Sequence, residues 1–560
     1  MSLRHNAGFK CLTGLCGSAA LPLSAPVGRW HELWSGWLTV RDAAQSRDKM
    51  LARNRFLLLV VVGGALLAII SLSLQFLNLI PTTPIVEEQP FKAIDGGFGV
   101  ALGKSRKRVF PVLHIQEPNP ILEAYGYCNT PNHTEQAWEG HSPADYKLLS
   151  VHVMIRHGDR YPLYFIPKTR RPSIDCTLSG SRKPTHPLLK SFISHMSQGG
   201  QGHWEAPLSS VPRLPNHSVC ETGELTQTGV VQHLRNGQLL QQAYKHHNLL
   251  SPDWAPRQLW VETTGKGRTL QSGLAFLYGF LPNFDWSKLT VRHQWSTLYC
   301  GSACDCPARN RYLDEEQRRQ YRLRVADTEL ERNYVDMAQT LGVPTRQLRA
   351  ANPVDSLLCH LCHDLSFPCV PAGGCLTMAQ FAVIRRQQLD DEADRRRVGL
   401  YHKYAILAMY PYLNRTASKM ERVAKSSEAG RRPRAAGEEV FTLSSAHDVT
   451  VAPLLSALGL EEARFPRFAA RVVFELWRSP PTTQGQPKKK AGIAKHGEVF
   501  IRVLYNGEDV TFHTTFCRSH ERRAGQPLCP LMNFLSFVRR DMFSIVNATS
   551  YQDACFTHSG

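Results

Sequence analysis

The chain has 560 residues and a formal net charge of +19 at pH 7. This length exceeds one comfortable domain, so a single small domain is excluded. A strongly basic protein attracts polyanions, but the sign of the charge does not identify the polyanion, and charge in solvated loops and tails contributes to the same total.

The first element in chain order is an apolar segment. Residues 56–74 are 19 residues without a charge, close to the length of about 20 that spans a bilayer. Basic residues outnumber acidic ones before it, and acidic residues follow it, so the positive-inside rule places the N-terminus in the cytosol. The basic residues are Arg41, Arg47, Lys49, Arg53 and Arg55, and the acidic residues beyond the segment are Glu87 and Glu88. We expect a cytosolic tail over residues 1–52 and a signal-anchor transmembrane helix over 53–80.

Two alternatives concern this N-terminal region. A cleaved signal peptide usually has an apolar core of about 7–15 residues, shorter than the segment here, so length favours an uncleaved anchor. Met50 lies directly before the segment and is a second candidate start site. Residues 1–49 show no clear periodicity, and the sequence does not decide between a tail and a gene-model extension. Behind such an anchor we expect no nucleic-acid partner, whereas a sulfated or phosphorylated glycan fits the topology.

Residues beyond the anchor carry features of a secretory compartment. Residues 81–144 are rich in proline and glycine and read as a stem. Two of the 15 cysteines, Cys11 and Cys16, precede the anchor, so 13 follow it, as suits an oxidising lumen. This odd number leaves at least one thiol free or paired between chains. Four N-glycosylation motifs also follow the anchor, at Asn132, Asn216, Asn414 and Asn547.

A strand followed by a charged loop opens the predicted catalytic region, residues 145–550. Alternating apolar residues from Leu149 to Ile155 predict the strand, and the run RHGDRYP at 156–162 follows it. A neutral imidazole at His157 can attack phosphorus and form a phosphohistidine. The guanidinium groups of Arg156 and Arg160 can each hold phosphate oxygens in a bidentate fork. Because ligands of open α/β sheets bind beyond the carboxyl ends of strands, we predict a phosphate site here.

Two later strand ends carry complementary residues. Residues 258–262 predict a strand, and Arg268 opens the helix after it, where helix N-termini favour anions. Residues 440–443 predict another buried strand, followed by His447, Asp448 and a short helix. We assign Arg268 and His447 to phosphate binding, and Asp448 to protonating the leaving alkoxide. Neither Arg268 nor His447-Asp448 is a specific signal alone. The prediction rests on three strand ends that are each followed by a suitable residue.

Between these strand ends, residues about 285–400 hold many cysteines and long charged helical patterns. We expect a helical cap inserted into an α/β core. The spacing of the segment CHLCH at 359–363, with Cys369 and Cys375 nearby, suits zinc. An oxidising lumen favours disulfides instead, so we predict disulfides and no metal. Cys300, Cys304 and Cys306 are expected in the same disulfide-rich region.

The last third of the chain predicts the edge of the sheet. Residues 472–477 and 499–504 predict strands, and Asn506-Gly507 predicts a hairpin turn before 510–516. We expect this edge to be antiparallel. The predicted fold class is therefore α/β, with a mixed sheet flanked by helices, an inserted helical cap and an N-terminal transmembrane helix.

Taken together, the motifs resemble those of the histidine acid phosphatases. RHGDRYP matches the family's RHGxRxP signature, and GRTLQSG at 267–273 and His447-Asp448 match its downstream motifs. The element GELTQTG at 223–229 looks like another family motif and leads into an amphipathic helix. The resemblance implies that His157 is the phosphorylated nucleophile and Asp448 the proton donor, with no metal or cofactor. It also implies phosphate binding by Arg156, Arg160, Arg268 and His447. Lys266-Gly267 departs from the acidic residues that many relatives carry there, so the family's leaving-group preferences do not transfer.

From Met50 onward the chain is also similar to a Golgi branch of this family, in segments such as ELTQTGVVQHL and YNGEDVTFHTTFC. This likeness implies removal of the 2-O-phosphate of xylose in the glycosaminoglycan–protein linkage region of proteoglycans, which promotes glycosaminoglycan synthesis. It implies a type II single-pass Golgi membrane protein with a lumenal catalytic domain, and a glycosaminoglycan or a xylose kinase as candidate partners. The alternatives are a phosphatase for another lumenal monoester (an inositol phosphate, a lysophospholipid or a phosphoprotein) and a non-catalytic glycan-binding protein.

Overall fold

The computed structural model describes residues 119–131, 138–141, 145–247, 257–428, 438–460, 463, 465–480, 497–519 and 528–556. The predicted cytosolic tail, the anchor at 53–80 and most of the predicted stem lie outside these residues. Among the residues described, no helix combines the length and the apolar character needed to cross a membrane.

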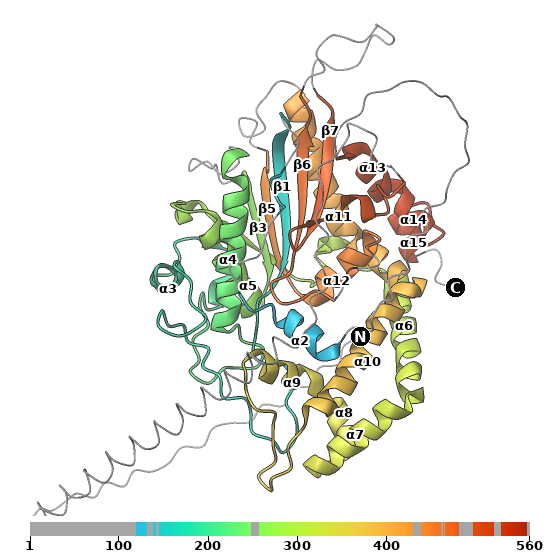
Figure 1. Ribbon diagram of the computed structural model, residues 1–560. Coiled ribbons are helices and arrows are strands. Elements are labelled where there is room, and N and C mark those ends of the chain that lie inside the picture. The colour runs from blue at the N-terminus through green and yellow to red at the C-terminus, as the bar shows by residue number, and fades with distance from the viewer. Residues whose placement is uncertain are drawn as a thin grey trace, which may run out of the picture. The chain divides into compact units, whose positions relative to one another are not determined.

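A mixed β-sheet lies at the centre of the described region (Figure 1). Its strands are β1 Lys147–Arg156, β2 His203–Trp204, β3 Leu259–Thr264, β4 Thr290–Gln294, β5 Phe441–Ala446, β6 Arg471–Arg478, β7 Val499–Tyr505, β8 Glu508–Asp509 and β9 Cys529–Pro530. The strand order is β2-β4-β3-β5-β1-β6-β7-β8, with β9 also paired to β7. The strands from β2 to β1 are parallel, and β6 to β9 pair antiparallel. The predicted α/β class and antiparallel edge are confirmed, although the return strand after Asn506-Gly507 is only two residues long.

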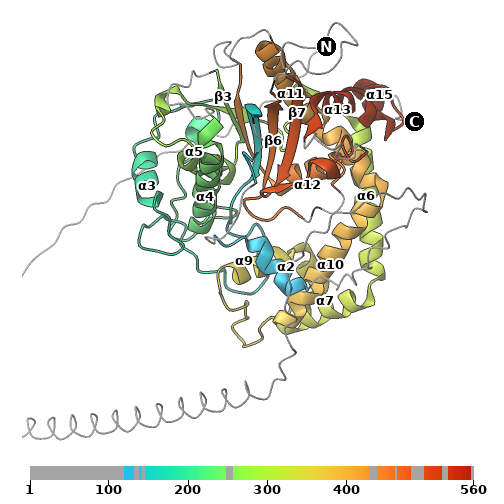
Figure 2. The ribbon, with the colours of Figure 1, turned by 45° about the horizontal axis from the view of Figure 1, so that its top comes forward.

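Helices cover both faces of this sheet (Figures 1 and 2). Their bounds are α2 Pro120–Cys128, α3 Leu189–Ser197, α4 Gln227–Tyr244, α5 Gly267–Phe280, α6 Pro307–Ala326, α7 Thr328–Leu341, α8 Thr345–Ala350, α9 Pro353–Cys362, α10 Met378–Arg397, α11 Gly399–Glu428, α12 Asp448–Ala457, α13 Leu531–Ser536, α14 Met542–Ser544 and α15 Tyr551–Phe556. Helices α4 and α5 share one apolar core with the sheet, and α11, α12 and α13 share another.

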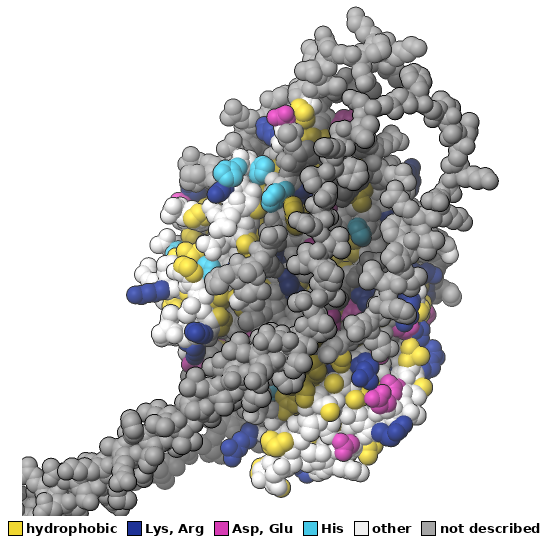
Figure 3. All heavy atoms as spheres, in the orientation of Figure 1, with side chains coloured by type: hydrophobic (Ala, Val, Ile, Leu, Met, Phe, Trp, Pro, Cys, Tyr) yellow, Lys and Arg dark blue, Asp and Glu magenta, His cyan; other side chains and the backbone are white. Residues whose placement is uncertain are grey.

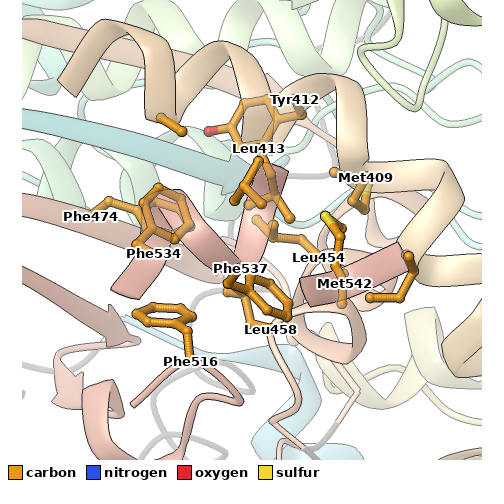
Figure 4. Packing of buried hydrophobic residues seen from close by; sticks show 14 of the residues in the cluster. Met409, Tyr412, Leu413, Leu454, Leu458, Phe474, Phe516, Phe534, Phe537 and Met542 are labelled. Atoms are coloured by element: carbon orange, nitrogen blue, oxygen red, sulfur yellow. The ribbon is translucent and has the colours of Figure 1, made fainter. Parts of the chain in front are cut away.

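The two faces of β1 contribute residues to different cores. Val151, Val153 and Ile155 belong to the core with α4 and α5, whereas Met154 belongs to the opposite one. Leu149 was expected on the same face as Val151, but a register shift between Leu148 and Ser150 turns it to the other face. Figure 4 shows this second core, where side chains of α11 and α12 meet Phe474 of β6 and aromatic residues of the C-terminal helices.

Three adjacent parallel strands end at the same level of the sheet. In the register of β1 with β5, Arg156 lies opposite Ala446, and in that of β3 with β5, Thr263 lies opposite Ser445. The residues that follow β1, β5 and β3 in sequence therefore emerge side by side. This topology brings together three motifs that are far apart in the chain.

The boundaries of the cap and of the stem differ from those predicted. Residues 290–294, which were assigned to the cap, form β4 and pair with β3, so the helical cap begins at Pro307 with α6 and continues through α10. Residues 119–141 were assigned to the stem, but their described part packs onto the core. Fully buried Glu139 pairs with Arg471 at 2.7 Å, and the amide of Gly140 donates to Glu475. The C-terminal helix α15 also belongs to this unit.

The cysteines form disulfides, as predicted. The pairs are Cys128–Cys362, Cys176–Cys220, Cys300–Cys304, Cys306–Cys555, Cys369–Cys375 and Cys517–Cys529. Among the described cysteines, the one outside these pairs is buried Cys359. The prediction that Cys306 joins the region around residue 360 is wrong, because it bridges to α15. In the zinc-like segment, His360 bonds to the Ser356 carbonyl and His363 to Asp159, so these side chains are already engaged.

Much of the cap's basic charge is paired locally. Figure 3 shows basic and acidic side chains interspersed over the described surface at its lower right. Arg319 pairs with Glu316 at 2.8 Å and with Asp394 at 2.5 Å, and Arg324 pairs with Asp391 at 2.7 Å. Glu316 and Asp391 are buried in these pairs, whereas Arg319 and Arg324 are partly exposed.

Glycines allow α4 and α5 to approach each other closely. A Cβ atom at Gly237 would overlap the carbonyl oxygen of Phe276, and one at Gly279 would overlap that of Leu234. Gly237→Ala should therefore lower the free energy of unfolding by about 2–3 kcal/mol through overpacking, despite the better helix propensity of alanine, worth about 1 kcal/mol. Chemical denaturation measures this change.

Gly126→Ala is the matched control, because Gly126 lies in α2 and a Cβ there meets no atom within 4 Å. It should leave stability unchanged or raise it by up to about 1 kcal/mol. Equal effects of the two substitutions would contradict the close approach of α4 and α5.

Candidate active site

His157 lies directly after β1 and is 2 % exposed. Its backbone amide donates to the Ala446 carbonyl at 2.9 Å, which joins the ends of β1 and β5. The ring Nδ1 lies 2.8 Å from the Gly158 carbonyl oxygen. Because a carbonyl only accepts, Nδ1 carries the proton and Nε2 keeps its lone pair. Burial and the nearby cations Arg268 and Arg156 hold the pKa of His157 well below its usual value of 6.5. The ring is therefore a neutral nucleophile.

Arg156 is fully buried and fixed on several sides. Its Nη1 donates to the Pro466 carbonyl at 2.7 Å, and its Nη2 donates to the Tyr127 hydroxyl at 2.7 Å and to Asp448 at 2.9 Å. The guanidinium also lies over aromatic rings, 4.9 Å from the centroid of Tyr127 and 4.5 Å from that of Phe468. Such cation–π contacts strengthen when they are desolvated.

Arg160 is held by a carboxylate from the cap. Its Nη2 and Nη1 donate to the two oxygens of Asp355 on α9, at 2.9 and 3.4 Å. Asp355 also accepts the backbone amide of Leu163 at 2.6 Å, so it fixes the loop as well as the side chain. This contact uses the end of the guanidinium formed by its two Nη atoms. The edge formed by Nε and Nη2 stays available for a second bidentate partner.

Arg268 is the second residue of α5 and completes the set of cations. Burial and the positive charges of Arg160 and Arg156, opposed by Asp448, lower its pKa to about 10, so it remains charged at neutral pH. The Nε atoms of Arg156, Arg160 and Arg268 are all buried and without a hydrogen-bond partner. Buried donors of this kind normally have partners. Three unsatisfied guanidinium donors around one imidazole are what a bound phosphate would satisfy.

His447 lies between β5 and α12, with its ring near that of His157, and Asp448 is the first residue of α12. The ring centroids of His447 and His157 are 5.5 Å apart, and the Thr264 hydroxyl holds His447 Nε2 at 2.9 Å. Burial and the charge of Arg268 lower the pKa of His447 to about 3, so it is neutral. Burial acts to raise the pKa of Asp448, but Arg156 and Arg160 outweigh it and hold the pKa below 3.8. Asp448 is thus ionised beside these arginines.

The GELTQTG element packs against the loop that carries His157. Thr226 caps α4 by accepting the Gly229 amide and donates its hydroxyl to Asp159 at 2.5 Å. A Cβ atom at Gly229 would overlap the Asp159 carbonyl oxygen, so only glycine lets α4 reach the loop. The predicted amphipathic helix after this motif is confirmed by α4, whose apolar face is buried.

The structure thus brings all six predicted residues into one site: Arg156, His157, Arg160, Arg268, His447 and Asp448. Sequence reasoning missed four supporting residues: Tyr127, Asp355, His363 and Thr264. His363 bonds to Asp159 at 2.7 Å, and it follows the same helix, α9, that carries Asp355. Tyr127 precedes Cys128, whose disulfide to Cys362 joins α2 to α9. His363 belongs to the CHLCH segment whose spacing suits zinc, and Tyr127 precedes Cys128, whereas Asp355 and Thr264 stand in no predicted motif.

The predicted glycosylation sites differ in accessibility. Asn132 lies outside the described residues. Asn216 and Asn547 are exposed, in loops. Asn414 lies within α11 and is half-buried, and Thr416 of its motif is only 4 % exposed. Because a glycan at Asn414 would need space that the helix packing occupies, the structure disfavours this site in the folded protein.

Comparisons with known proteins agree with this geometry. The family model described as the histidine phosphatase superfamily (branch 2) matches residues 147–506. The chain is 65 % identical to 2-phosphoxylose phosphatase 1 of Danio rerio over 518 residues, covering 90 % of this chain and 99 % of that protein. It is 54 % identical to 2-phosphoxylose phosphatase 1 of Homo sapiens over 511 residues, with the same coverage. Among solved structures, a multiple inositol polyphosphate phosphatase of Bifidobacterium longum with inositol hexasulfate matches at a TM-score of 0.46 and 14 % identity, covering 74 % of this chain and 96 % of that one.

The contact between Asp355 and Arg160 leads to a testable expectation. Asp355→Asn removes one of two charge-assisted hydrogen bonds, each worth about 1.5–3 kcal/mol, and leaves Arg160 misplaced. We expect the KM for 4-nitrophenyl phosphate to rise about tenfold, with a smaller change in kcat. Steady-state kinetics measure both constants.

Two further variants separate positioning from general damage. Glu331→Gln breaks a similar carboxylate–arginine pair, with Arg349, far from the nucleophile, and should leave KM unchanged. In an Arg160→Met background, Asp355→Asn should have little further effect, because Asp355 acts through Arg160. Additive losses in the double variant would contradict this role.

Proposed function

Because the chain belongs to the histidine phosphatase superfamily (branch 2), we propose that it hydrolyses phosphate monoesters through a phosphohistidine at His157. We propose further that its substrate is the 2-phosphate of xylose in the glycosaminoglycan–protein linkage region. The observation that carries the chemistry is the neutral His157, with its free Nε2, beside three guanidinium groups whose buried Nε donors lack partners.

In the first half-reaction, the phosphate dianion binds to Arg156, Arg160, Arg268 and His447. His157 Nε2 attacks phosphorus, an N–P bond forms, and the bond from phosphorus to the C2 oxygen of xylose breaks. The leaving oxygen takes a proton from Asp448, because an alkoxide is too basic to leave unprotonated. The cations stabilise the charge on the phosphoryl oxygens during transfer.

In the second half-reaction, water replaces the sugar. The Asp448 carboxylate accepts a proton from this water as its oxygen attacks phosphorus, and the N–P bond breaks. His157 returns to its neutral form, Asp448 regains its proton, and inorganic phosphate leaves.

Asp448 has to gain a proton before it can serve as an acid. In the empty site the field of Arg156 and Arg160 keeps it ionised, despite burial. A bound phosphate dianion offsets these positive charges and adds a negative one, which raises the pKa of the carboxyl. Substrate binding thus switches Asp448 to its acid form.

The sugar specificity rests on the two relatives named above, which the chain matches over 99 % of their length. The proposed location is the Golgi lumen, with the uncharged segment at 56–74 as a type II anchor. Six disulfides among the described residues support an oxidising compartment. Exposed Asn216 and Asn547 are the proposed glycan acceptors within this part of the chain. Removal of the phosphate would promote glycosaminoglycan synthesis, and a xylose kinase would supply the substrate.

Phosphate release from a 2-phosphoxylosyl linkage glycopeptide tests this function. The lumenal fragment should release inorganic phosphate, and His157→Ala should reduce release to background because the nucleophile is lost. Turnover of an aryl phosphate but not of the glycopeptide would favour another monoester as substrate. No turnover of either, with retained binding to heparin, would favour a glycan-binding protein.

Asp448→Asn should distinguish leaving groups. General acid catalysis contributes about 10²–10⁴-fold, so kcat/KM for the glycopeptide should fall by that factor. The kcat/KM for 4-nitrophenyl phosphate should fall less than about tenfold, because this constant reports the transfer to His157 and the phenolate leaves without a proton. Equal losses on the two substrates would contradict the role of Asp448 as acid.

The pH dependence of kcat for the glycopeptide has a defined sign. Asp448 must be protonated in the complex, so kcat is lost as pH rises through its pKa there, and this alkaline limb should be absent in Asp448→Asn. His157 must be neutral, and its pKa lies well below 6.5, so activity should persist as pH falls through 6.5. A wild-type acid limb centred near 6.5 would contradict the depressed pKa of His157.

A further inference from the structure

A large cavity adjoins the phosphate site. Its volume is about 850 Å³, and it lies between α2, α10, the chain after α12 and the β7–β8 hairpin. Tyr127 and Phe465 line it, and both rings also pack against the Arg156 guanidinium, with centroids 4.9 and 5.9 Å from it. The cavity and the phosphate site therefore share a wall. Figures 1 and 2 both show α2 beside α10 at this end of the sheet.

Arg385 of α10 lines this cavity and is 6 % exposed. Its Nη1 donates to the neutral side chain of Gln388 at 2.9 Å, and its Nε is buried without a partner. The guanidinium lies 5.4 Å from the centroid of Tyr127, on the ring that also contacts Arg156. Within the described residues, Arg385 forms no ion pair.

Glu392 and Glu123 act electrostatically on Arg385, but neither forms an ion pair with it among the described residues, unlike the carboxylates beside other buried arginines near the sheet. Arg160 pairs with Asp355, Arg471 with Glu139, and Arg502 with Glu475, at 2.7–2.9 Å. A buried cation without a paired anion is costly. Such a charge is retained where a ligand supplies the anion, and guanidinium groups suit carboxylates and sulfate esters.

The rest of the cavity suits a sugar chain more than a bare ion. Its volume is within the range of small-ligand sites, about 300–1,000 Å³. Besides Tyr127 and Phe465, the rings of Tyr505 and Phe512 contribute to its lining. Two carboxylates, Glu123 and Glu508, and two further arginines, Arg467 and Arg518, line it as well. The buried guanidinium of Arg385 marks one position for one acidic group.

We propose that this cavity binds a non-reacting part of the substrate glycan and that Arg385 pairs with an acidic group there, a carboxylate or a sulfate ester. The proposal rests on the function proposed above and adds a specificity-determining site to it. Binding energy from this remote contact would favour glycans that carry a second anion besides the phosphate.

Kinetics with matched substrates test the site. The substrates are 4-nitrophenyl phosphate and three phosphoxylosyl glycopeptides: one with a uronate, the same one with its carboxyl group reduced to a neutral alcohol, and the reduced one carrying a sulfate ester. Wild-type enzyme should have a KM about tenfold lower for at least one acidic glycopeptide than for the neutral one. Arg385→Gln should abolish that difference and leave the kinetics on 4-nitrophenyl phosphate within about twofold of wild type.

Two further variants serve as controls. Arg386→Gln changes the next residue, which points outward with a side chain 47 % exposed, and should keep the wild-type preference. Arg385→Lys, which retains the charge, should restore part of it. Unchanged turnover of 4-nitrophenyl phosphate by Arg385→Gln shows that the fold and the phosphate site are intact.

A binding measurement separates this proposal from the proposed substrate. The dephosphorylated acidic glycopeptides should inhibit 4-nitrophenyl phosphate hydrolysis by wild type, and about tenfold less well by Arg385→Gln. Inhibition that depends on Arg385, without glycopeptide turnover, would support the site and refute the xylose substrate. Equal KM values for acidic and neutral glycopeptides in wild type would overturn the site, as would an Arg385→Gln defect of equal size on every substrate.

Discussion

The concentration of buried positive charge around one imidazole is the constraint on which this structure depends. Arg156, Arg160 and Arg268 repel one another, and each loses hydration on burial. The fold offsets this cost with anions and dipoles from separate elements. Asp448 at the start of α12 pairs with Arg156, Asp355 on α9 pairs with Arg160, and the Tyr127 hydroxyl accepts from Arg156. The site is therefore a set of cations held in place by groups that a phosphate can partly replace.

The same electric field explains the protonation states that catalysis requires. It depresses the pKa of His157, so that the nucleophile keeps its lone pair. It also keeps Asp448 ionised until a phosphate dianion offsets it. The positive charges thus lower the pKa of both groups, which readies the nucleophile but leaves the acid to be protonated when a phosphate dianion binds.

The parts of this site that sequence could predict are those tied to strand ends. Apolar alternation located β1, and short apolar runs located β3 and β5, so the residues after them could be placed together by the topology of parallel strands. Tyr127, Asp355 and His363 could not be predicted in this way, because they come from helices whose packing over the site depends on tertiary contacts. The register shift at Leu148 and the inclusion of residues 290–294 in the sheet likewise depend on pairing between strands that leaves no local pattern.

Helix α9 connects the cap to the residues of the active site. It supplies Asp355 to Arg160, it precedes His363, which bonds to Asp159, and its Cys362 is joined to Cys128 beside Tyr127. Asp355 and His363 thus hold the loop that carries His157 at two points, and the disulfide joins α9 to α2. A cap built in this way fixes Arg160 and the loop that follows β1.

Covalent phosphorylation of His157 is the central claim, and rapid quenching during turnover tests it most directly. Wild-type enzyme mixed with a 2-phosphoxylosyl glycopeptide, quenched in alkali and digested, should yield a peptide phosphorylated on Nε2 of His157 by mass spectrometry. Phosphate release without any phosphorylated peptide, or phosphate on another residue, would contradict the account.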